Sequence, residues 1–302
     1  MFTVNLVSRE NGVGLSTDME LLQGFLSQLG GDVQRVDWTS RHMRPCDVAI
    51  FLELFNPRLT RYARNKVGLF NLEWFLPGWK HHLPRFTQLW AKSQDAHEAY
   101  QQLGLNSHLT GFLTRDLYDH TVPRTATCLH LRGHSSQKNT DTVLKAWESH
   151  PNLPPLTIVS ADPLRVPPGV TVLPRMTATG ISHQLNTHRI HVCPSKAEGW
   201  GHYITEGMST GALVITTDAP PMNEHIQPDW GILVPPVRSG PRGMVREHLV
   251  DPDDLADAVR WAFSFPSATL GAMSHQAICQ VWRRNDMFAL KVIELLGELG
   301  CV

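Results

Sequence analysis

Residues 191–224 read HVCPSKAEGWGHYITEGMSTGALVITTDAPPMNE, and this stretch decides the fold class. The apolar run Ile190–Cys193 predicts a buried strand, which Pro194 ends. A glycine-containing loop and a helix over His202–Thr210 follow, and the apolar run Leu213–Thr216 predicts the next strand. Strand, loop, helix and strand in this order are typical of the parallel, doubly wound sheets of α/β proteins.

The same alternation of short apolar runs with helix-period segments continues over most of the 302 residues. Further strands are expected at Phe2–Val7, Asp32–Asp37, Val48–Leu52, Lys66–Phe70, Thr87–Ala91, Thr127–Leu131, Leu156–Val159 and Val170–Leu173. Further helices are expected at Asp18–Leu29 with Asp18 as its cap, Asn56–Asn65, Ser93–Leu103, Lys138–Glu148, Thr179–His188, Asp253–Phe265 and Val281–Leu299. The irregular segment Asp119–Thr125 interrupts the pattern. We therefore expect two Rossmann-like, doubly wound parallel-sheet domains over residues 1–122 and 123–280, followed by a last helix within 281–302.

Bulk composition narrows the class of protein. With 42% apolar and 18% charged residues the chain is typical of a globular protein, and its net charge of −1 favours no class of partner. The five cysteines are scattered without metal-ligand spacing, which predicts a reduced, cytoplasmic protein. The N-terminal residues begin directly as a strand, so we expect no signal peptide. No run approaches the roughly 20 apolar residues that cross a membrane, so we expect no integral membrane contact.

Two acidic residues, Glu198 and Glu206, flank the glycines Gly199 and Gly201. Bare backbone N–H groups before a helix attract an anion such as a diphosphate. A carboxylate cannot usefully face phosphate oxygens, but it accepts hydrogen bonds from vicinal hydroxyl groups. A nucleotide sugar offers both, because its ribose and its hexose carry hydroxyls on either side of a diphosphate. His202 and Glu206 share one helix face, and Glu198 lies in the preceding loop. We therefore expect Glu198 and Glu206 to point into one pocket from different levels.

Two cations upstream fit the same ligand. The segment 129–141, LHLRGHSSQKNTD, places Arg132 at the end of a predicted strand and Lys138 at the start of the next helix. At the edge of a cleft between two sheets, such cations suit a departing diphosphate, because its negative charge grows as the sugar–phosphate bond breaks.

These residues resemble the family of retaining GT-B glycosyltransferases, the glycosyl transferases group 1, whose motif is Glu-x7-Glu. The motif context P-S-x-x-E-G-x-G-x-x-x-x-E is matched by Pro194, Ser195, Glu198, Gly199, Gly201 and Glu206. Arg132 and Lys138 match the family's phosphate-binding Arg and Lys, and the resemblance covers about residues 127–299. It implies a GT-B fold whose last helix returns to the first domain. It also implies metal-independent transfer of a hexose from a nucleotide diphosphate sugar, by default UDP-glucose.

The resemblance implies roles for single residues. Glu206 would bind the ribose, Glu198 the transferred sugar, and the backbone at Gly201 and His202 the phosphates. A simple capping or packing role for His202 stays open. The remaining implied site residues are Arg132 and Lys138 as catalytic cations together with Glu198, Tyr203 in the donor site and Arg175 at the nucleobase.

The loop 8–18, SRENGVGLSTD, follows the first predicted strand. Gly12 and Gly14 suit either a phosphate-binding loop or a plain tight turn, and the G-K-[ST] ending of a Walker loop is missing from this loop. In the resembled family this loop borders the donor diphosphate and the acceptor, so Asn11 is a candidate together with both glycines.

The segment 69–75, LFNLEWF, ends another predicted strand, where the resembled family often carries a histidine. It offers Asn71 as an acceptor-binding candidate. Glu73 is a catalytic candidate that would orient the acceptor hydroxyl, or else a buried structural partner. No protein base is required, because same-face attack in this family lets the leaving phosphate accept the acceptor's proton.

From Arg35 to Lys92 the chain has ten Arg and Lys but four acidic residues. This excess of cations, which includes Arg61, suits a phosphate-rich acceptor together with the aromatic residues Trp74 and Trp79. The alternative is an ordinary solvated helix face along residues 58–66.

The sequence leaves the chemical class of the acceptor open. Similarity to uncharacterised phage and bacterial glycosyltransferases favours DNA with a hydroxymethylated base, flipped out of the duplex. Alternatives are a polysaccharide or glycolipid, a small metabolite, a nucleotide-sugar epimerase of the same fold, and a non-catalytic nucleotide-sugar binder. A metal-dependent D-x-D site would require Asp251 and Asp253, which better predict a helix N-terminus. The oligomeric state is also open.

Overall fold

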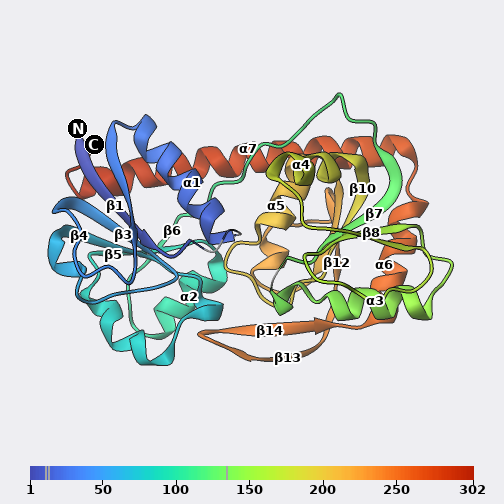
Figure 1. Cartoon of the computed structure of the whole chain (residues 1–302), viewed down its shortest axis with the longest axis horizontal. Coiled ribbons are helices and arrows are strands. Elements are labelled where there is room, and N and C mark those ends of the chain that lie inside the picture. Colours follow the sequence, from blue (N-terminus) through green and yellow to red (C-terminus); the bar gives the residue numbers. More distant parts are fainter. Residues whose placement is uncertain (11, 13, 134) are drawn as a thin grey trace. The chain divides into compact units, whose positions relative to one another are not determined.

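The computed structural model describes residues 1–10, 12, 14–133 and 135–302, and it divides into two compact units. Unit 1 comprises Met1–Leu113, Pro241–Arg246 and Arg284–Val302, and unit 2 comprises Thr114–Gly240 and Glu247–Arg283. Each unit contains a six-stranded parallel sheet with helices packed on it, which confirms the predicted α/β class (Figure 1).

The sheet of unit 1 has the strand order β2-β1-β3-β4-β5-β6. Its strands are β1 (Phe2–Ser8), β2 (Gly31–Asp37), β3 (Cys46–Leu52), β4 (Ala63–Leu69), β5 (Gln88–Ala91) and β6 (His108–Leu109). In β1, Val4 pairs with Val33 of β2 and with Val48 of β3. Val4, Leu6 and Val7 are fully buried, as expected for an inner strand of a parallel sheet whose two faces are both covered.

The connections of unit 1 differ from the prediction at two places. The connecting segments are helices α1 (Gly14–Gln28) and α2 (Gln94–Gln102) and the 3-10 turns η1 (Thr60–Tyr62), η2 (Leu72–Trp74) and η3 (Pro77–Arg85). Asp18 is not the cap of α1, because the helix begins at Gly14 and Asp18 lies inside it, buried against Lys92. Asn56–Asn65 is not one helix. Its end joins β4, because the segment has no apolar helical face to bury, whereas pairing with β3 satisfies its backbone.

The sheet of unit 2 has the strand order β12-β11-β10-β7-β8-β9. Its strands are β7 (Thr125–Leu131), β8 (Leu156–Val159), β9 (Val170–Leu173), β10 (His188–Cys193), β11 (Leu213–Thr217) and β12 (Gly231–Val234). The helical segments are η4 (Ser136–Lys138), α3 (Thr140–Ser149), α4 (Ala178–Thr187), α5 (His202–Ser209), η5 (Met222–Glu224) and α6 (Pro252–Ser264). Neighbouring strand residues face opposite cores: Cys128 packs with Val143 of α3 and Val259 of α6, whereas Leu129 packs with Leu185 of α4.

Two features of the C-terminal part were not predicted from the sequence. A hairpin of β13 (Pro236–Arg242) and β14 (Val245–Val250) follows β12, and its tip belongs to unit 1. Helix α7 (Ser267–Glu298) begins well before the predicted start at Val281, because Met273 and Ala277 are buried in the apolar cores of unit 2. From Arg284 onward the helix belongs to unit 1, as predicted for the last helix.

Each sheet has one point where the strand order reverses. This point lies between β1 and β3 in unit 1 and between β7 and β10 in unit 2. The loops after the carboxyl ends of two such strands leave in opposite directions, so ligands bind in the crevice between them in sheets of this type. The residues that follow these strands are therefore the candidates for binding in each unit.

Candidate functional site

The start of helix α5 supplies the backbone of the candidate site in unit 2. β10 ends at Cys193, and the loop that follows reaches Gly201, which adopts the left-handed conformation with φ of 89° as the N-terminal cap of α5. A Cβ at Gly201 would lie 3.3 Å from the Ile204 side chain and 3.5 Å from that of Glu198. Glycine therefore both permits the turn and lets the loop lie close to the helix, and the cap residue itself contributes no side-chain hydrogen bond to the first turn.

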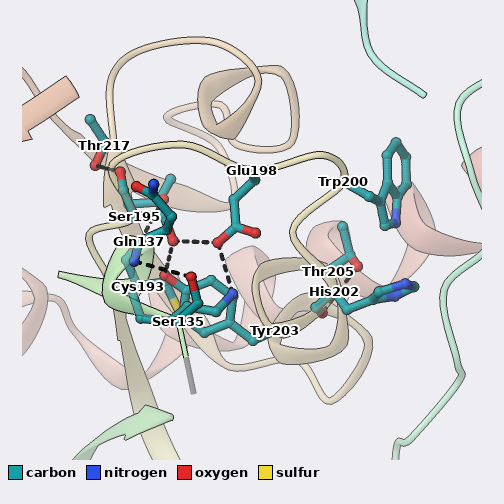
Figure 2. Close-up of polar contacts among 12 residues, drawn as sticks. Ser135, Gln137, Cys193, Ser195, Glu198, Trp200, His202, Tyr203, Thr205 and Thr217 are labelled. Carbon is teal, nitrogen blue, oxygen red and sulfur yellow. Dashed lines mark hydrogen bonds and ion pairs between the residues drawn. The ribbon is translucent and has the colours of Figure 1, made fainter. Parts of the chain in front are cut away.

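The carboxylate of Glu198 accepts two hydrogen bonds at one oxygen. Lys138 Nζ lies 2.7 Å from Glu198 Oε1, and the Ser195 hydroxyl donates to the same oxygen at 2.5 Å. Lys138 Nζ also lies 3.5 Å from the centroid of the Tyr203 ring. Figure 2 shows Glu198 pointing toward Ser195, with the ring of His202 directed away from this cluster. The structure thus joins two predicted residues, Lys138 and Glu198, across the reversal point of the unit 2 sheet.

Tyr203 and Ser195 support this cluster from beneath. Tyr203 is buried, burial raises the pKa of its phenol well above the ordinary value, and its hydroxyl forms a hydrogen bond with that of Ser195. Thr217 donates to the Ser195 carbonyl at 2.7 Å, which ties the loop to the end of β11. Tyr203 thus holds the loop in place through Ser195 and offers its ring face to Lys138.

Glu206 lies one turn into α5, where the charges of neighbouring basic residues act on its carboxyl group. Its side chain is 12% exposed, and Arg115 Nη1 lies 3.9 Å from Glu206 Oε1. Burial raises the pKa of the Glu206 carboxyl, and the charges of His202, Arg115 and Lys138 oppose that rise. Lys138 thus pairs directly with Glu198 and acts on Glu206 only through its charge.

Arg132 occupies the neighbouring strand end. Its Nη1 lies 3.0 Å from Asp162 Oδ2 and 3.1 Å from Ser160 Oγ, both after β8. Burial lowers the pKa of the His130 imidazole to about 4, and the charges of Lys138 and Arg132 contribute to that shift. The two predicted cations therefore lie near one buried histidine, although Arg132 pairs with Asp162 rather than with a motif glutamate. Arg175 lies exposed after β9.

The predicted residues of unit 1 fall into separate places. Gly12 has φ of 68° and donates its N–H to Ser16 at 2.8 Å, Gly14 is the first residue of α1, and Asn11 lies outside the described residues. Arg61 lies exposed beside Tyr62, with 3.0 Å between its Nη2 and the Tyr62 hydroxyl. The loop glycines and Arg61 therefore belong to different elements.

Turn η2 carries two of the other candidates, Glu73 and Trp74. Glu73 is buried, and Trp74 is 42% exposed with the Arg242 guanidinium 4.3 Å from its ring centroid. Gly243, at the hairpin tip, lies so close that a Cβ there would come within 2.4 Å of the Leu72 carbonyl. Trp79 follows on η3, half-buried against Phe75, and Asn71 joins a buried polar network described below.

Sequence reasoning missed the charged residues of that network: Arg9, Asp18, Glu53 and Lys92. Each of Arg9, Glu53 and Lys92 stands directly after a buried strand of unit 1, where a charged residue is unexpected unless it serves a ligand or a partner. That position was the signal available in the sequence.

The excess of cations in residues 35–92 is reduced by pairing within unit 1. Arg35 contacts Glu10, Arg44 contacts Asp32, and Lys92 is buried against Asp18. Within the described ranges, no group of three or more His, Cys, Asp or Glu is arranged to hold a metal ion. In the part of the chain that the structure describes, no helix has an apolar stretch of the length needed to span a lipid bilayer.

Known proteins resemble this chain in fold and, over part of its length, in sequence. Residues 127–264 match the profile of the family described as Glycosyl transferases group 1. Similar solved structures include a glycosyltransferase from Rickettsia africae, at 14% identity over 99% of this chain and 98% of that chain, with a TM-score of 0.76. Sucrose-phosphate synthase from Thermosynechococcus elongatus is 14% identical over 99% of each chain, with a TM-score of 0.74.

HepE from Anabaena, solved in complex with UDP and glucose, is also 14% identical, over 99% of this chain and 100% of that chain, with a TM-score of 0.68. Identities this low show the fold alone, and the predicted GT-B fold is confirmed on that ground. A comparison with curated protein sequences finds no match.

Proposed function

We propose that this chain is a retaining hexosyltransferase that takes its sugar, by default glucose, from a nucleotide diphosphate sugar bound in unit 2. The observation that carries the proposal is the ion pair of Lys138 with Glu198 beside the start of α5, where burial raises the pKa of Glu206 and the charge of Lys138 opposes that rise. The family matched by residues 127–264 and the HepE complex with UDP and glucose support it.

The charge arrangement of the site suits this ligand. A diphosphate replaces Glu198 as the partner of Lys138 and takes the backbone amides at Gly201 and His202 as further donors. Glu198, released from Lys138, accepts hydrogen bonds from hydroxyls of the transferred sugar. Glu206 accepts from the ribose, and the charge of Lys138 partly offsets the cost that burial imposes on the ionised Glu206 carboxylate.

In the proposed reaction the acceptor oxygen attacks the anomeric carbon on the face from which the diphosphate departs. The bond from that carbon to the phosphate oxygen breaks, and the leaving phosphate takes the acceptor's proton, so no separate protein base is needed. Lys138 and the start of α5 stabilise the negative charge that grows on the leaving group, with Arg132 at the next strand end. These fixed positive charges are our reason for proposing a metal-independent reaction.

DNA with a hydroxymethylated base stays the sequence-based prediction for the acceptor. Trp74, exposed and stacked with Arg242, has the surface that a flipped base would need. The pairing of Arg35, Arg44 and Lys92 leaves fewer cations for phosphates than the sequence suggested. A saccharide acceptor is the second candidate, favoured by the buried network of unit 1.

Product analysis tests the proposal. The full chain is incubated with UDP-, GDP-, ADP- and TDP-glucose, with and without hydroxymethylated DNA or a mixture of oligosaccharides. Release of nucleotide diphosphate that increases with an acceptor, with the sugar recovered on that acceptor in the α-configuration, is expected. Release of free sugar and nucleotide at a rate that acceptors leave unchanged would instead identify an epimerase or hydrolase, and no turnover with bound nucleotide sugar would identify a binder.

A further inference from the structure

A continuous chain of polar side chains lies at the carboxyl edge of the unit 1 sheet. Arg9 Nη2 lies 3.0 Å from Glu53 Oε1, and Asn71 Nδ2 donates to Glu53 Oε2 at 3.3 Å. Asn71 Oδ1 accepts from Lys92 Nζ at 2.9 Å, and Lys92 pairs with Asp18 at 2.6 Å. These residues join the ends of β1, β3, β4 and β5 with helix α1.

Fold stability alone does not account for this chain. The side chains of Lys92 and Asp18 are 1% and 3% exposed, and that of Glu53 is 6% exposed. Well-packed apolar residues at such positions stabilise a fold as well as or better than buried ions. Lys92 and Asp18 neutralise each other and fix Asn71, which in turn orients the carboxylate of Glu53. The network thus holds one carboxylate in a fixed orientation.

Glu53 also has an unusual backbone. Its φ of 56° lies in the left-handed region, which among the described residues other than glycine only Asn139 shares. The Leu54 amide donates to the Leu52 carbonyl at 2.5 Å, which closes a three-residue turn centred on Glu53. Residues held in such conformations cluster at ligand sites, where the fold fixes a side chain for binding.

The position of this turn is the one where unit 1 is expected to bind a ligand. Arg9 follows β1 and Glu53 follows β3, so their ion pair spans the reversal point of the sheet. The Arg9 side chain is 51% exposed, so a ligand reaches the pair from the solvent side. In unit 2 the corresponding point is spanned by Lys138 and Glu198.

We propose that Arg9 and Glu53 bind two neighbouring hydroxyl groups of an uncharged polyol, and that the acceptor is therefore the second candidate, a saccharide, in place of the DNA expected from the sequence. A carboxylate accepts a hydrogen bond from one hydroxyl while a guanidinium donates to the next, which matches a vicinal diol. A phosphate would gain Arg9 but would face the fixed charge of Glu53. The pair therefore selects neutral hydroxylated groups over phosphates. The inference rests on the proposed function only in naming the polyol as the acceptor.

Binding of methyl α-D-glucopyranoside to the full chain, titrated by ligand-observed NMR without any nucleotide, tests this inference. Glu53→Gln keeps the shape but loses the charge, and Arg9→Met removes the donor. Each is expected to weaken binding at least about fivefold. Glu20→Gln, on the exposed face of α1, is the matched control and leaves binding within about twofold. Glu206→Gln tests whether the glucoside occupies the donor site of unit 2 instead.

Equal binding by all variants, or a loss in Glu206→Gln alone, would overturn the inference. Competition by inorganic phosphate or by duplex DNA at the concentration of the glucoside would also overturn it, since the site would then be a phosphate site. If Glu53→Gln does not fold, Arg9→Met decides the matter, because Arg9 is half exposed. A chain that binds the glucoside through Glu53 but binds no nucleotide sugar contradicts the proposed function and leaves this inference standing.

Discussion

Lys138 and Glu198 lie 60 positions apart in the chain, yet the lysine Nζ and the glutamate Oε1 meet at 2.7 Å. A helix start and a strand-end loop bring them together at the reversal point of the unit 2 sheet. The two charges neutralise each other, and under the proposed function an anion that takes Lys138 releases Glu198 for hydroxyl groups. We therefore expect binding of the two halves of a nucleotide sugar to be coupled.

Replacement of Lys138 by Met is expected to weaken nucleotide-sugar binding roughly 10- to 100-fold, since a hydrogen bond to a charged group contributes roughly 1.5–3 kcal/mol. Isothermal titration calorimetry with UDP-glucose measures the effect. Lys145→Met, on the exposed face of α3, is the matched control and keeps the affinity of the unmodified protein. Equal affinity in both variants would show that Lys138 does not contact the donor.

The raised pKa of Glu206 predicts that its replacement by glutamine increases the free energy of unfolding but weakens donor binding. Its raised pKa means that the folded protein holds the proton more tightly, so ionised Glu206 lowers the free energy of unfolding as the pH rises through that pKa. Glu206→Gln should therefore gain stability over the unmodified protein at high pH while binding UDP-glucose about tenfold more weakly.

Urea denaturation across the pH range, paired with calorimetry, checks both parts of this prediction. Glu148→Gln, at an exposed position at the end of α3, is the control and should change neither quantity. A stability difference between Glu206→Gln and the unmodified protein that shrinks as the pH rises would contradict the account.

Much of the fold and of the unit 2 site followed from the sequence. Strands with both faces covered, such as Phe2–Val7 and Ile190–Cys193, could be predicted because most of their residues are apolar, as an inner strand of a parallel sheet requires. The approach of Lys138 to Glu198 could be expected because each residue follows such a strand, whereas the role of Glu206 in a donor site stays a prediction.

What the sequence did not reveal depends on contacts between distant segments. Glu53 and Lys92 look like ordinary charged residues until β3 and β5 place them on one sheet edge. The hairpin β13–β14 carries no strong strand pattern, and the close approach of Gly243 to Leu72 fixes its tip. Likewise, Asp18 reads as a helix cap, and only the buried Lys92 explains its place inside α1.

Gly201→Ala is expected to reduce both stability and donor binding. A Cβ at φ of 89° costs roughly 1–2 kcal/mol and crowds Ile204 and Glu198. Gly169→Ala is the matched control, because Gly169 has φ of 84° but open space around it. Thermal unfolding should show a loss in both variants that is at least as large in Gly201→Ala, whereas UDP-glucose titration should show weaker binding in Gly201→Ala alone. Weaker binding in both would assign the effect to general destabilisation.

Buried histidines make unit 2 sensitive to acid. Burial lowers the pKa of His130 and His188 to about 4 and that of His191 to about 3. The unfolded chain takes up protons near pH 6.5, so stability falls as the pH drops from there toward 4. For His130 alone the loss between pH 7 and pH 5 is on the order of 2 kcal/mol.

Urea titrations at pH 7 and pH 5 measure this loss. His130→Gln should reduce the difference between the two pH values, and His120→Gln, at an exposed position, should keep it. An unchanged pH dependence in His130→Gln would mean that His130 is not held neutral by burial.

The most direct test of the central claim is a thermal-shift panel of UDP-, GDP-, ADP- and TDP-sugars on the unmodified protein and on Lys138→Met. A ligand that binds only the folded state raises the melting temperature by mass action. We predict a concentration-dependent rise with one nucleotide sugar that is largely lost in Lys138→Met. No rise with any member of the panel, or the same rise in both proteins, would contradict a nucleotide-sugar site built on Lys138, Glu198 and Glu206.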